Sequence, residues 1–314
     1  MIPPIQGDAS CKASDYTGSQ SAAANPLGRR RLCLAYDRRI VLLALPQPYD
    51  FHASTERFRS YGIDRANAWH DDGLHRVVGG QEVRIGAARG GVLVEPADAA
   101  ILDQVGWSLG ASLDLAGFWR FASSDPVFEP FAEPLASYRP PLVADRWEML
   151  VTSITAQQVS LHSAFAVRSR LIERFGVHHH RAWAFPTRAR IAEASEPEIR
   201  EVGFSTRKAE YVIGLAQSDL DLDALDELDD EGVIEAITAR RGLGRWTADW
   251  FLARALARPD AWPAGDLAVR KAVSFFYGEG RNLDEMEVRE VGERFGSWRN
   301  IACHMLLASA RIHG

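Results

Sequence analysis

Two glycines and one carboxylate in the C-terminal third of the chain have types and spacing that suit chemistry on nucleic acid. Gly242 and Gly244 lie in a turn between two predicted helices, where the lack of side chains lets the backbone approach another molecule. The free N–H groups of the following helix suit a phosphate. Asp266 comes one helix later, in a loop rich in Pro and Gly. A phosphate clamp and a carboxylate one helix apart indicate an activity on nucleic acid.

The elements that must position these residues divide the chain into three parts. Residues 1–30 are rich in Ser, Ala, Gly, Asn and Gln and have no hydrophobic period, which predicts a disordered tail. Residues 31–112 carry strand patterns, including a hairpin signature around Gly79-Gly80, and predict an α+β domain. Residues 113–314 have helical patterns almost throughout. The predicted fold class is therefore mainly α with an α+β N-terminal domain.

Capping signals give several helix boundaries. Asp145-Arg146-Trp147-Glu148 has the form of a capping box that opens a helix. Ser160 is a predicted cap of the next helix, which stops at Gly176. Ser195 precedes a short helix with Pro in its first turn, and Asn282-x-x-Glu285 precedes another.

Composition restricts the class of protein. Hydrophobic content of 46% and charged content of 25% are ordinary for a soluble globular protein, and no apolar run is long enough for a membrane span. No secretory pattern is visible at the N-terminus, and three scattered cysteines suit a reducing compartment. We expect a cytoplasmic protein without membrane contact, associated with the nucleoid if the source is prokaryotic.

The net charge of −6 disfavours a nucleic-acid partner, but the charges are distributed unevenly along the chain. Nine of the 42 acidic residues fall between Asp219 and Glu235, a run that is typical of a solvated face. From Ile237 to Lys271 there are seven basic residues and three acidic ones. We expect this basic segment to meet the nucleic acid.

Five ordered motifs give the chain a resemblance to a known family. They are Trp147-Glu148-x-Leu150 with Ile154-x-x-Gln157-Gln158-Val159-Ser160, Ser205-x-x-Lys208-Ala209-x-Tyr211, Gly242-x-Gly244-x-Trp246-Thr247-Ala248, Pro263-x-x-Asp266-Leu267-x-x-Arg270-Lys271-Ala272 and Ser297-Trp298-Arg299. From about residue 32 to the end the chain resembles the helix-hairpin-helix DNA glycosylases, most closely the 3-methyladenine DNA glycosylase II branch. The resemblance implies a helix-hairpin-helix core, a small antiparallel-sheet domain, and a monomer that acts on damaged duplex DNA.

Asp266 has two compatible interpretations. An Asp directly before a helix is a common N-cap, and a capping carboxylate stays ionised against the helix dipole. Breaking an N-glycosidic bond builds positive charge on the sugar, which a fixed carboxylate can stabilise while it orients a water at C1′. The resemblance implies that Asp266 is the catalytic residue.

Trp246 bears on the mode of action. In the bifunctional relatives this position carries a lysine that forms a Schiff base, and a tryptophan cannot do so. The resemblance therefore implies a monofunctional hydrolase without strand cleavage. Trp246, Trp250 and Trp298 are candidates for the walls of a base pocket, because ring faces attract cationic alkylated purines. Trp246 and Trp250 are also four residues apart on one helix, so both fit an ordinary core.

Candidate DNA contacts come from the hairpin and from a polar turn. Gly242, Gly244, Arg245 and Thr247 lie where the resemblance places the backbone clamp. The turn Gln157-Gln158 also fits an ordinary polar connection between two helices. The resemblance directs Gln157 to the base pocket and makes Gln158 the residue that fills the gap left by an extruded nucleotide. Gln158 departs in part from the family, whose best-known member has an apolar residue there.

Metal and cofactor expectations follow in the same way. The resemblance implies no required cofactor, but a monovalent ion (Na or K) held by backbone carbonyls near Thr238, Arg240 and Leu243. Arg240 departs from the apolar residue usual at its position, although its stem can pack while its head reaches water. Three cysteines exclude the four-cysteine iron–sulfur cluster of the endonuclease III-like relatives. Consecutive His178-His179-His180 cannot converge on one metal from a helix, and a surface loop is expected there.

The predicted function is a monofunctional DNA glycosylase that removes alkylated purines of the 3-methyladenine type and so initiates base excision repair. Two alternatives stay open: a glycosylase for oxidised or deaminated bases such as 8-oxoguanine, hypoxanthine or uracil, and a non-catalytic module that binds damaged DNA. A methyl-transfer repair protein fits less well, because no cysteine lies in a reactive-looking motif.

Overall fold

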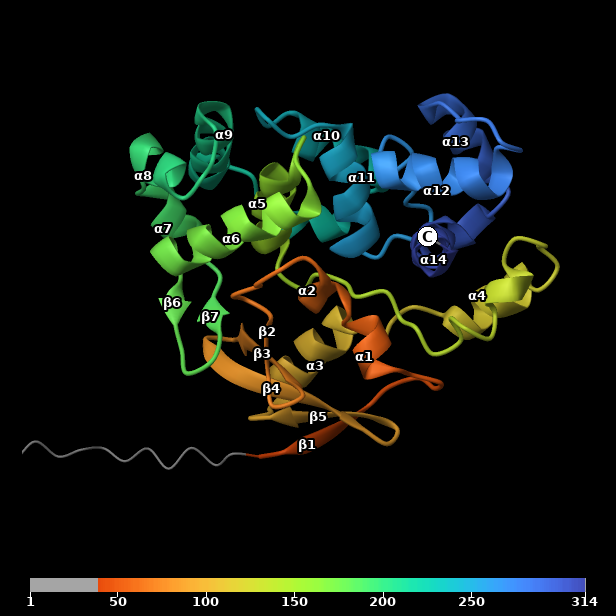
Figure 1. Ribbon diagram of the computed structural model, residues 1–314. Coiled ribbons are helices and arrows are strands. Elements are labelled where there is room, and N and C mark those ends of the chain that lie inside the picture. The colour runs from red at the N-terminus through yellow and green to blue at the C-terminus, as the bar shows by residue number, and fades with distance from the viewer. Residues whose placement is uncertain (1–38, 314) are drawn as a thin grey trace, which may run out of the picture. The chain divides into compact units, whose positions relative to one another are not determined.

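An antiparallel sheet opens the part of the chain that the computed structural model describes, residues 39–313 (Figure 1). Its strand order is β1-β5-β4-β3-β2, with β1 at Val41–Ala44, β2 at Ala68–His70, β3 at Gly73–Val78, β4 at Gln81–Ala88 and β5 at Gly91–Glu95. β3 and β4 are joined through Gly79 and Gly80, whose φ values of +58° and +80° suit glycine. The predicted hairpin is confirmed.

One helix covers the sheet. α3 (Ala99–Ser108) buries Ile101 and Val105 in the same hydrophobic cluster as Val83, Ile85 and Val92 of the strands. Two short helices, α1 (Phe51–Ser54) and α2 (Arg57–Ser60), precede β2, and Phe51 also lies in this cluster.

The rest of the chain is mainly helical, which confirms the predicted fold class. The helices are α4 (Leu115–Ala122), α5 (Arg146–Ala156), α6 (Leu161–Phe175), α7 (Arg188–Ala192), α8 (Glu196–Glu201), α9 (Thr206–Gln217), α10 (Asp230–Thr238), α11 (Arg245–Arg254), α12 (Leu267–Tyr277), α13 (Glu285–Glu293) and α14 (Arg299–His313), with 3₁₀ turns η1 (Glu129–Phe131), η2 (Ala224–Glu227) and η3 (Gly296–Trp298).

A two-stranded ribbon interrupts the helices. β6 (Val177–His178) pairs with β7 (Trp183–Ala184), and the run of three histidines begins in its first strand. The His178 ring lies 4.6 Å from the Trp183 ring, centroid to centroid. Between residues 39 and 313 no group of three His, Cys, Asp or Glu side chains could hold a metal ion.

The capping predictions are confirmed at most helix starts and wrong in two details. Asp145, Ser160 and Ser195 are N-caps and Gly176 ends α6. However, the Glu148 carboxylate does not return to its own N-cap, because it pairs with Arg168 and Arg76. The cap of α13 is Asp284, which forms a capping box with Glu287, in place of the predicted start at Asn282.

The buried residues of one hydrophobic cluster end at Leu109, and those of a second cluster begin at Leu113. The described residues, 39–313, nevertheless belong to one compact unit, so the predicted domain boundary between 112 and 113 stays a prediction. The predicted disordered tail, residues 1–30, lies outside the described residues. Among residues 39–313 no helix is both long and apolar enough to cross a membrane.

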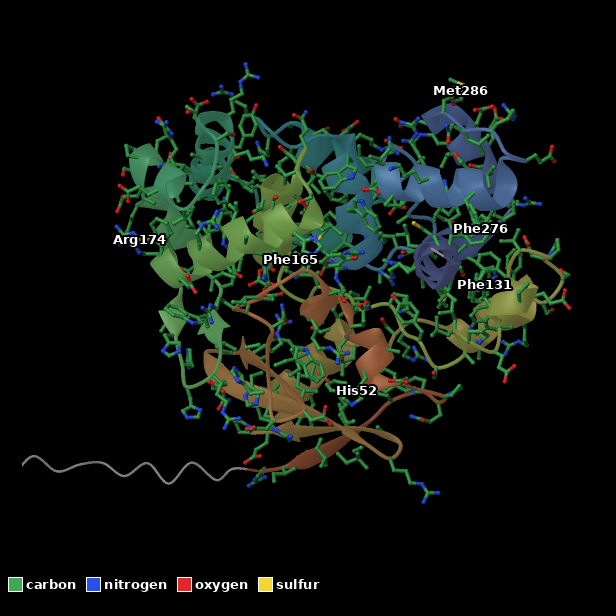
Figure 2. All side chains as sticks on the ribbon, viewed as in Figure 1. His52, Phe131, Phe165, Arg174, Phe276 and Met286 are labelled. Atoms are coloured by element: carbon green, nitrogen blue, oxygen red, sulfur yellow. The ribbon has the colours of Figure 1, made fainter. Side chains whose placement is uncertain are left out.

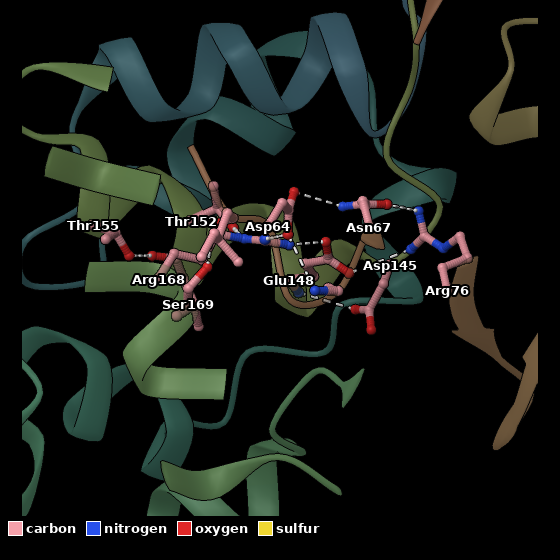
Figure 3. A network of polar contacts seen from close by, with 12 residues as sticks. Asp64, Asn67, Arg76, Asp145, Glu148, Thr152, Thr155, Arg168 and Ser169 are labelled. Carbon is pink, nitrogen blue, oxygen red and sulfur yellow. Dashed lines mark hydrogen bonds and ion pairs between the residues drawn. The ribbon is translucent and has the colours of Figure 1, made fainter. Parts of the chain in front are cut away.

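A buried polar network joins the segment before β2 to α5 and α6 (Figure 3). The Arg168 guanidinium donates to Asp64, to Glu148 and, at 3.1 Å, to the Thr152 hydroxyl. Asp64 also accepts from the Asn67 amide at 2.9 Å. Arg168 and Asp64 expose 4% and 2% of their side chains, so these charges are compensated almost entirely by one another.

Candidate active site and DNA-binding hairpin

α10 and α11 flank a tight hairpin whose shape depends on Gly242. This residue has φ +88°, and a Cβ there would lie 2.1 Å from Cγ of the Tyr211 ring. Both the left-handed backbone and the packing of Tyr211 therefore require glycine. The Gly242 carbonyl accepts a hydrogen bond of 2.8 Å from Nε2 of Gln157, which fixes the hairpin to the end of α5.

Gly244 has a different role, because it leaves the start of α11 open. It is the exposed N-cap of α11, its φ of −119° is extended backbone, and no atom lies within 4 Å of the position of a Cβ. No side chain caps the first N–H groups of α11, which carry the positive end of the helix dipole. This helix start therefore offers backbone donors to a phosphate.

We expect Gly244→Val to weaken DNA binding without unfolding the protein. The valine fits the extended backbone but blocks close approach, so lesion-bearing and undamaged duplexes should lose affinity by a similar factor. That factor should be about tenfold or more, since a charge-assisted hydrogen bond contributes about 1.5 kcal/mol or more. Fluorescence titrations of both duplexes at several salt concentrations measure the effect and its electrostatic part.

A matched variant separates binding from folding at this hairpin. Gly242→Ala should lower the melting temperature, because the added Cβ meets Tyr211 and φ is positive, whereas Gly244→Val should leave it unchanged. Full affinity of Gly244→Val for undamaged DNA would show that the hairpin is not the clamp.

Arg245 and Thr247 differ in what they offer to DNA. The Arg245 side chain is 48% exposed and donates from Nε to Asp249 at 2.7 Å, so its outer guanidinium atoms face solvent. Thr247 is 1% exposed and its backbone N–H donates to the Gly244 carbonyl. We therefore correct the prediction for Thr247, which has no surface with which to contact DNA.

The predicted cation ligands, Thr238, Arg240 and Leu243, lie on one short path at the end of α10. The Arg240 carbonyl accepts from the Leu243 N–H at 3.1 Å, which uses one of its two lone pairs. Carbonyl oxygens of this kind fit a monovalent ion, whose only role there would be to add positive charge beside the hairpin. The Arg240 side chain pairs with Asp219 at 3.0 Å and is 29% exposed, as its predicted snorkelling requires.

Asp266 is the N-cap of α12 and the acceptor of four hydrogen bonds. Oδ1 accepts from the N–H groups of Ala268 and Val269, at 2.8 and 3.1 Å. Oδ2 accepts from Nε1 of Trp246 at 2.7 Å and of Trp250 at 3.1 Å. Every partner is a donor, which suits an ionised carboxylate that only accepts. Both interpretations of Asp266 therefore fit the same geometry, because the capping hydrogen bonds hold the carboxylate in place.

Packing of α12 fixes the place of this carboxylate. Phe276 near the C-terminal end of α12 meets Phe131 of η1 edge to face, with ring centroids 5.6 Å apart (Figure 2). Val269 and Val273 of the same helix are buried in the large cluster. A helix held at both ends keeps its N-cap in a constant position relative to α11.

The three tryptophans make different contacts. Trp246 and Trp250 both bond to Asp266, so they lie beside the carboxylate and are not merely core. Trp298 instead stacks on Phe121 of α4 at 6.2 Å and meets Phe118 edge to face. The Trp298 ring therefore packs against α4, and its assignment to the base pocket stays a prediction.

Gln157 and Gln158 behave differently within one turn. Gln157 ends α5 and is tied to the hairpin through Gly242, and its role toward a base stays a prediction. Gln158 has φ +54° and is exposed between α5 and α6. Val159 and Leu161 beside it are each 46% exposed. The turn therefore projects Gln158 with apolar neighbours, as a residue that fills a base-stack gap requires.

Sequence reasoning missed the groups behind Trp250. The Arg254 guanidinium carbon lies 4.4 Å from the centre of the Trp250 ring, and the His304 ring lies 5.8 Å from it. Arg254 was visible as the next residue of the i, i+4, i+8 series that begins at Trp246. His304 comes from α14, and no local pattern connects it to this site.

Comparison with known proteins supports the predicted resemblance. Residues 151–296, just under half of the chain, match the model of the HhH-GPD superfamily base excision DNA repair protein. The chain is 25% identical over 201 residues to a DNA-3-methyladenine glycosylase of Bacillus subtilis, covering 62% of this chain and 66% of the relative. It is 27% identical to DNA-3-methyladenine glycosylase 2 of Escherichia coli over 169 residues, 52% of this chain and 57% of the relative.

Solved structures agree with this placement. A 3-methyladenine DNA-glycosylase from Archaeoglobus fulgidus superposes with a TM-score of 0.78 and 26% identity, covering 88% of this chain and 99% of that one. An 8-oxoguanine glycosylase/lyase from Clostridium acetobutylicum, with a TM-score of 0.72, 18% identity, and coverage of 84% and 92%, shares the fold. The predicted resemblance to the helix-hairpin-helix glycosylases, in the 3-methyladenine branch, is confirmed. The chain spans just under two thirds of the Bacillus relative's length and just over half of the Escherichia relative's.

Proposed function

We propose that this protein is a DNA glycosylase that hydrolyses the N-glycosidic bond of alkylated purines, of the 3-methyladenine type, in duplex DNA and so initiates base excision repair. The observation that carries the proposal is the Asp266 carboxylate, held by two indoles and two helix N–H groups next to the hairpin helix. The names of the relatives supply the substrate class.

The residues of the site would have separate roles in catalysis and in DNA binding. A fixed negative charge stabilises the cation that develops on the sugar as the bond to the base breaks. The same carboxylate can orient a water toward C1′. The open start of α11 and the exposed Arg245 contact the phosphate backbone of the duplex, and Gln158 enters the gap left by the extruded nucleotide. A monovalent ion at the hairpin carbonyls would assist the backbone contact without a part in bond cleavage.

Hydrolysis without strand cleavage is part of the proposal. The position that would hold a Schiff-base lysine is Trp246, whose Nε1 is bonded to Asp266. Lys208 donates from Nζ to the Thr155 carbonyl at 3.0 Å, and burial lowers its pKa. Lys271 is exposed on α12. Neither lysine occupies the position from which an imine to C1′ would form.

Borohydride should therefore trap no covalent complex between the protein and a damaged duplex. Reduction fixes an imine, and the site offers no lysine to form one. The measurement is denaturing electrophoresis of labelled duplex after incubation with the reductant, with a known glycosylase/lyase as positive control. A stable adduct of the unmodified protein would overturn the monofunctional assignment.

The function itself is tested by base release from duplexes that each carry one defined lesion. We expect release of alkylated purines from duplex DNA, as a monomer, with no added metal or cofactor. Release of oxidised bases alone would favour the first alternative. Lesion-specific binding without any release would favour the non-catalytic alternative. A methyl-transfer protein is not favoured, because burial and the charge of Asp266 raise the pKa of the Cys303 thiol, which is 1% exposed.

A further inference from the structure

An arginine and a buried aspartate form an ion pair at the start of α11. Arg245 is the first residue of this helix, directly after the exposed Gly244, and Asp249 lies one turn later. Nε of Arg245 donates to Oδ1 of Asp249 at 2.7 Å, and the two side chains are 48% and 4% exposed. The pair therefore joins a cation that faces solvent to a carboxylate in the protein interior.

Helix stability does not explain this pair. A cation at a helix N-terminus meets the positive end of the helix dipole, and a cation that precedes its acidic partner by four residues is the less favourable order. Burial raises the pKa of the Asp249 carboxyl, so its ionised form has a cost in free energy. Oδ2 of Asp249 accepts no hydrogen bond from any residue between 39 and 313. Buried polar atoms are almost always paired, so this arrangement indicates a functional role.

A second helix helps to hold the carboxylate of Asp249. Nη2 of Arg289, on α13, lies 3.7 Å from Oδ2 of Asp249 and donates to Oε1 of Glu285 at 2.7 Å. Arg289 thus adds positive charge beside Oδ2 from outside hydrogen-bonding distance. The Asp249 carboxylate is fixed between α11 and α13, and it presents Oδ1 to Arg245 in one direction.

The outer part of Arg245 stays available to a ligand. Within residues 39–313 its side chain makes no hydrogen bond except the one from Nε to Asp249. The two terminal nitrogens of a guanidinium form a planar fork that matches two oxygens of a phosphate. An arginine normally loses much rotamer freedom when it binds, and a side chain that is already held loses less. The pair therefore leaves this fork in solvent beside the open N–H groups of α11.

We propose that Asp249 is a positioning residue, which holds Arg245 ready to bind a backbone phosphate of duplex DNA next to the open start of α11. This inference rests on the proposed function, because that function places duplex DNA at the hairpin. Asp249 itself is too deeply buried to touch the duplex. Its charge alone would repel phosphates, so positioning and simple electrostatics predict effects of opposite sign on DNA binding.

Asp249→Ala should weaken binding of lesion-bearing and undamaged duplexes alike, by about two- to tenfold, although it removes a negative charge. Fluorescence titrations measure both affinities. Single-turnover release of 3-methyladenine at saturating enzyme should keep its rate, so that only the enzyme concentration for half-maximal release rises. We expect the variant to fold, because water can solvate Arg245 and Arg289 keeps its bond to Glu285.

Two further variants show whether Asp249 acts through Arg245. Asp249→Asn keeps an oxygen that accepts from Nε of Arg245 and removes only the charge, so it should restore most of the lost affinity. In a protein that already carries Arg245→Ala, Asp249→Ala should have no further effect on affinity, because no guanidinium remains to be held.

Glu210→Ala is the matched control at the same hairpin. Glu210, on α9, pairs with Arg241 at 2.9 Å, and these side chains are 38% and 76% exposed. A solvated pair of this kind positions little. Loss of this carboxylate should therefore leave DNA affinity unchanged or raise it. Thermal melting of every variant checks that each one is folded at the temperature of the titrations.

The outcomes distinguish the inference from the function on which it rests. Unchanged or raised affinity of the folded Asp249→Ala protein would overturn the inference, and so would an equal loss when Arg245→Ala is already present. Release of no base by the unmodified protein, together with the expected losses of affinity, would refute the glycosylase assignment and leave the role of Asp249 in DNA binding intact.

Discussion

Asp266→Asn should slow base release by about a hundredfold or more, because the amide supplies no negative charge to the cation that forms on the sugar. Lesion-bearing duplex should still bind, since Gly244, Arg245 and the turn at Gln158 are unchanged. Single-turnover release of 3-methyladenine measures the rate, and a fluorescence titration measures the affinity.

The geometry of Asp266 also predicts a cost in stability. An asparagine has one oxygen and one NH₂ group, but all four partners of Asp266 are donors. Either the two indoles or the two helix N–H groups must then face an NH₂ group, at a cost of about 1–3 kcal/mol for a buried polar group left unpaired. The variant should unfold at a lower denaturant concentration than the unmodified protein, so rates must be measured where it is folded.

Asp284→Asn is the matched control for this variant. Asp284 is an N-cap on α13 that accepts from the Glu287 N–H at 2.9 Å, far in sequence from the hairpin. Its substitution should change stability by a few tenths to about 1 kcal/mol and leave base release unchanged. If Asp266→Asn released 3-methyladenine at the parental rate, another group would have to be the catalyst.

Arg168→Met should lower the free energy of unfolding by about 3–5 kcal/mol, because it leaves the buried Asp64 carboxylate without a cation and Glu148 with only the weaker pair to Arg76. Asp64 and Glu148 expose 2% and 9% of their side chains, and two ionised carboxylates cannot donate a hydrogen bond to each other. The methionine fills most of the volume of the arginine stem, so lost packing contributes little. Urea unfolding followed by circular dichroism gives the free energy.

Arg65→Met is the corresponding control at the same contact with α6. Arg65 pairs with Glu173, and these side chains are 40% and 38% exposed. Solvated pairs of this kind contribute about 0–1 kcal/mol, so this variant should be close to the parent. Equal losses in the two variants would mean that burial does not govern the strength of these pairs.

Local patterns in the sequence determined much of the fold and of the site. The hairpin between β3 and β4 followed from Gly79-Gly80 between two apolar runs, and the caps Asp145, Ser160 and Ser195 marked true helix starts. These features depend on a few consecutive residues whose backbone preferences do not need the rest of the molecule. Asp266 as an N-cap beside the hairpin helix belongs to this group.

Other parts of the site could be decided only by tertiary packing. The contacts of Trp298 with Phe118 and Phe121 depend on how η3 meets α4, and the burial of Thr247 depends on the face that α11 turns to the core. Glu148 pairs with Arg168 and does not close the predicted capping box, since a buried cation attracts the carboxylate more strongly than a backbone N–H at an exposed helix start.

The clearest division lies at Asp266 and the groups behind Trp250, Arg254 and His304. The sequence by itself identified the carboxylate and the glycine hairpin, because both are local and have short motifs. The approach of His304 on α14 to the Trp250 ring on α11 spans more than fifty residues of sequence and follows no period. Contacts between such distant segments are set by the packing of whole helices, so only the tertiary structure shows them.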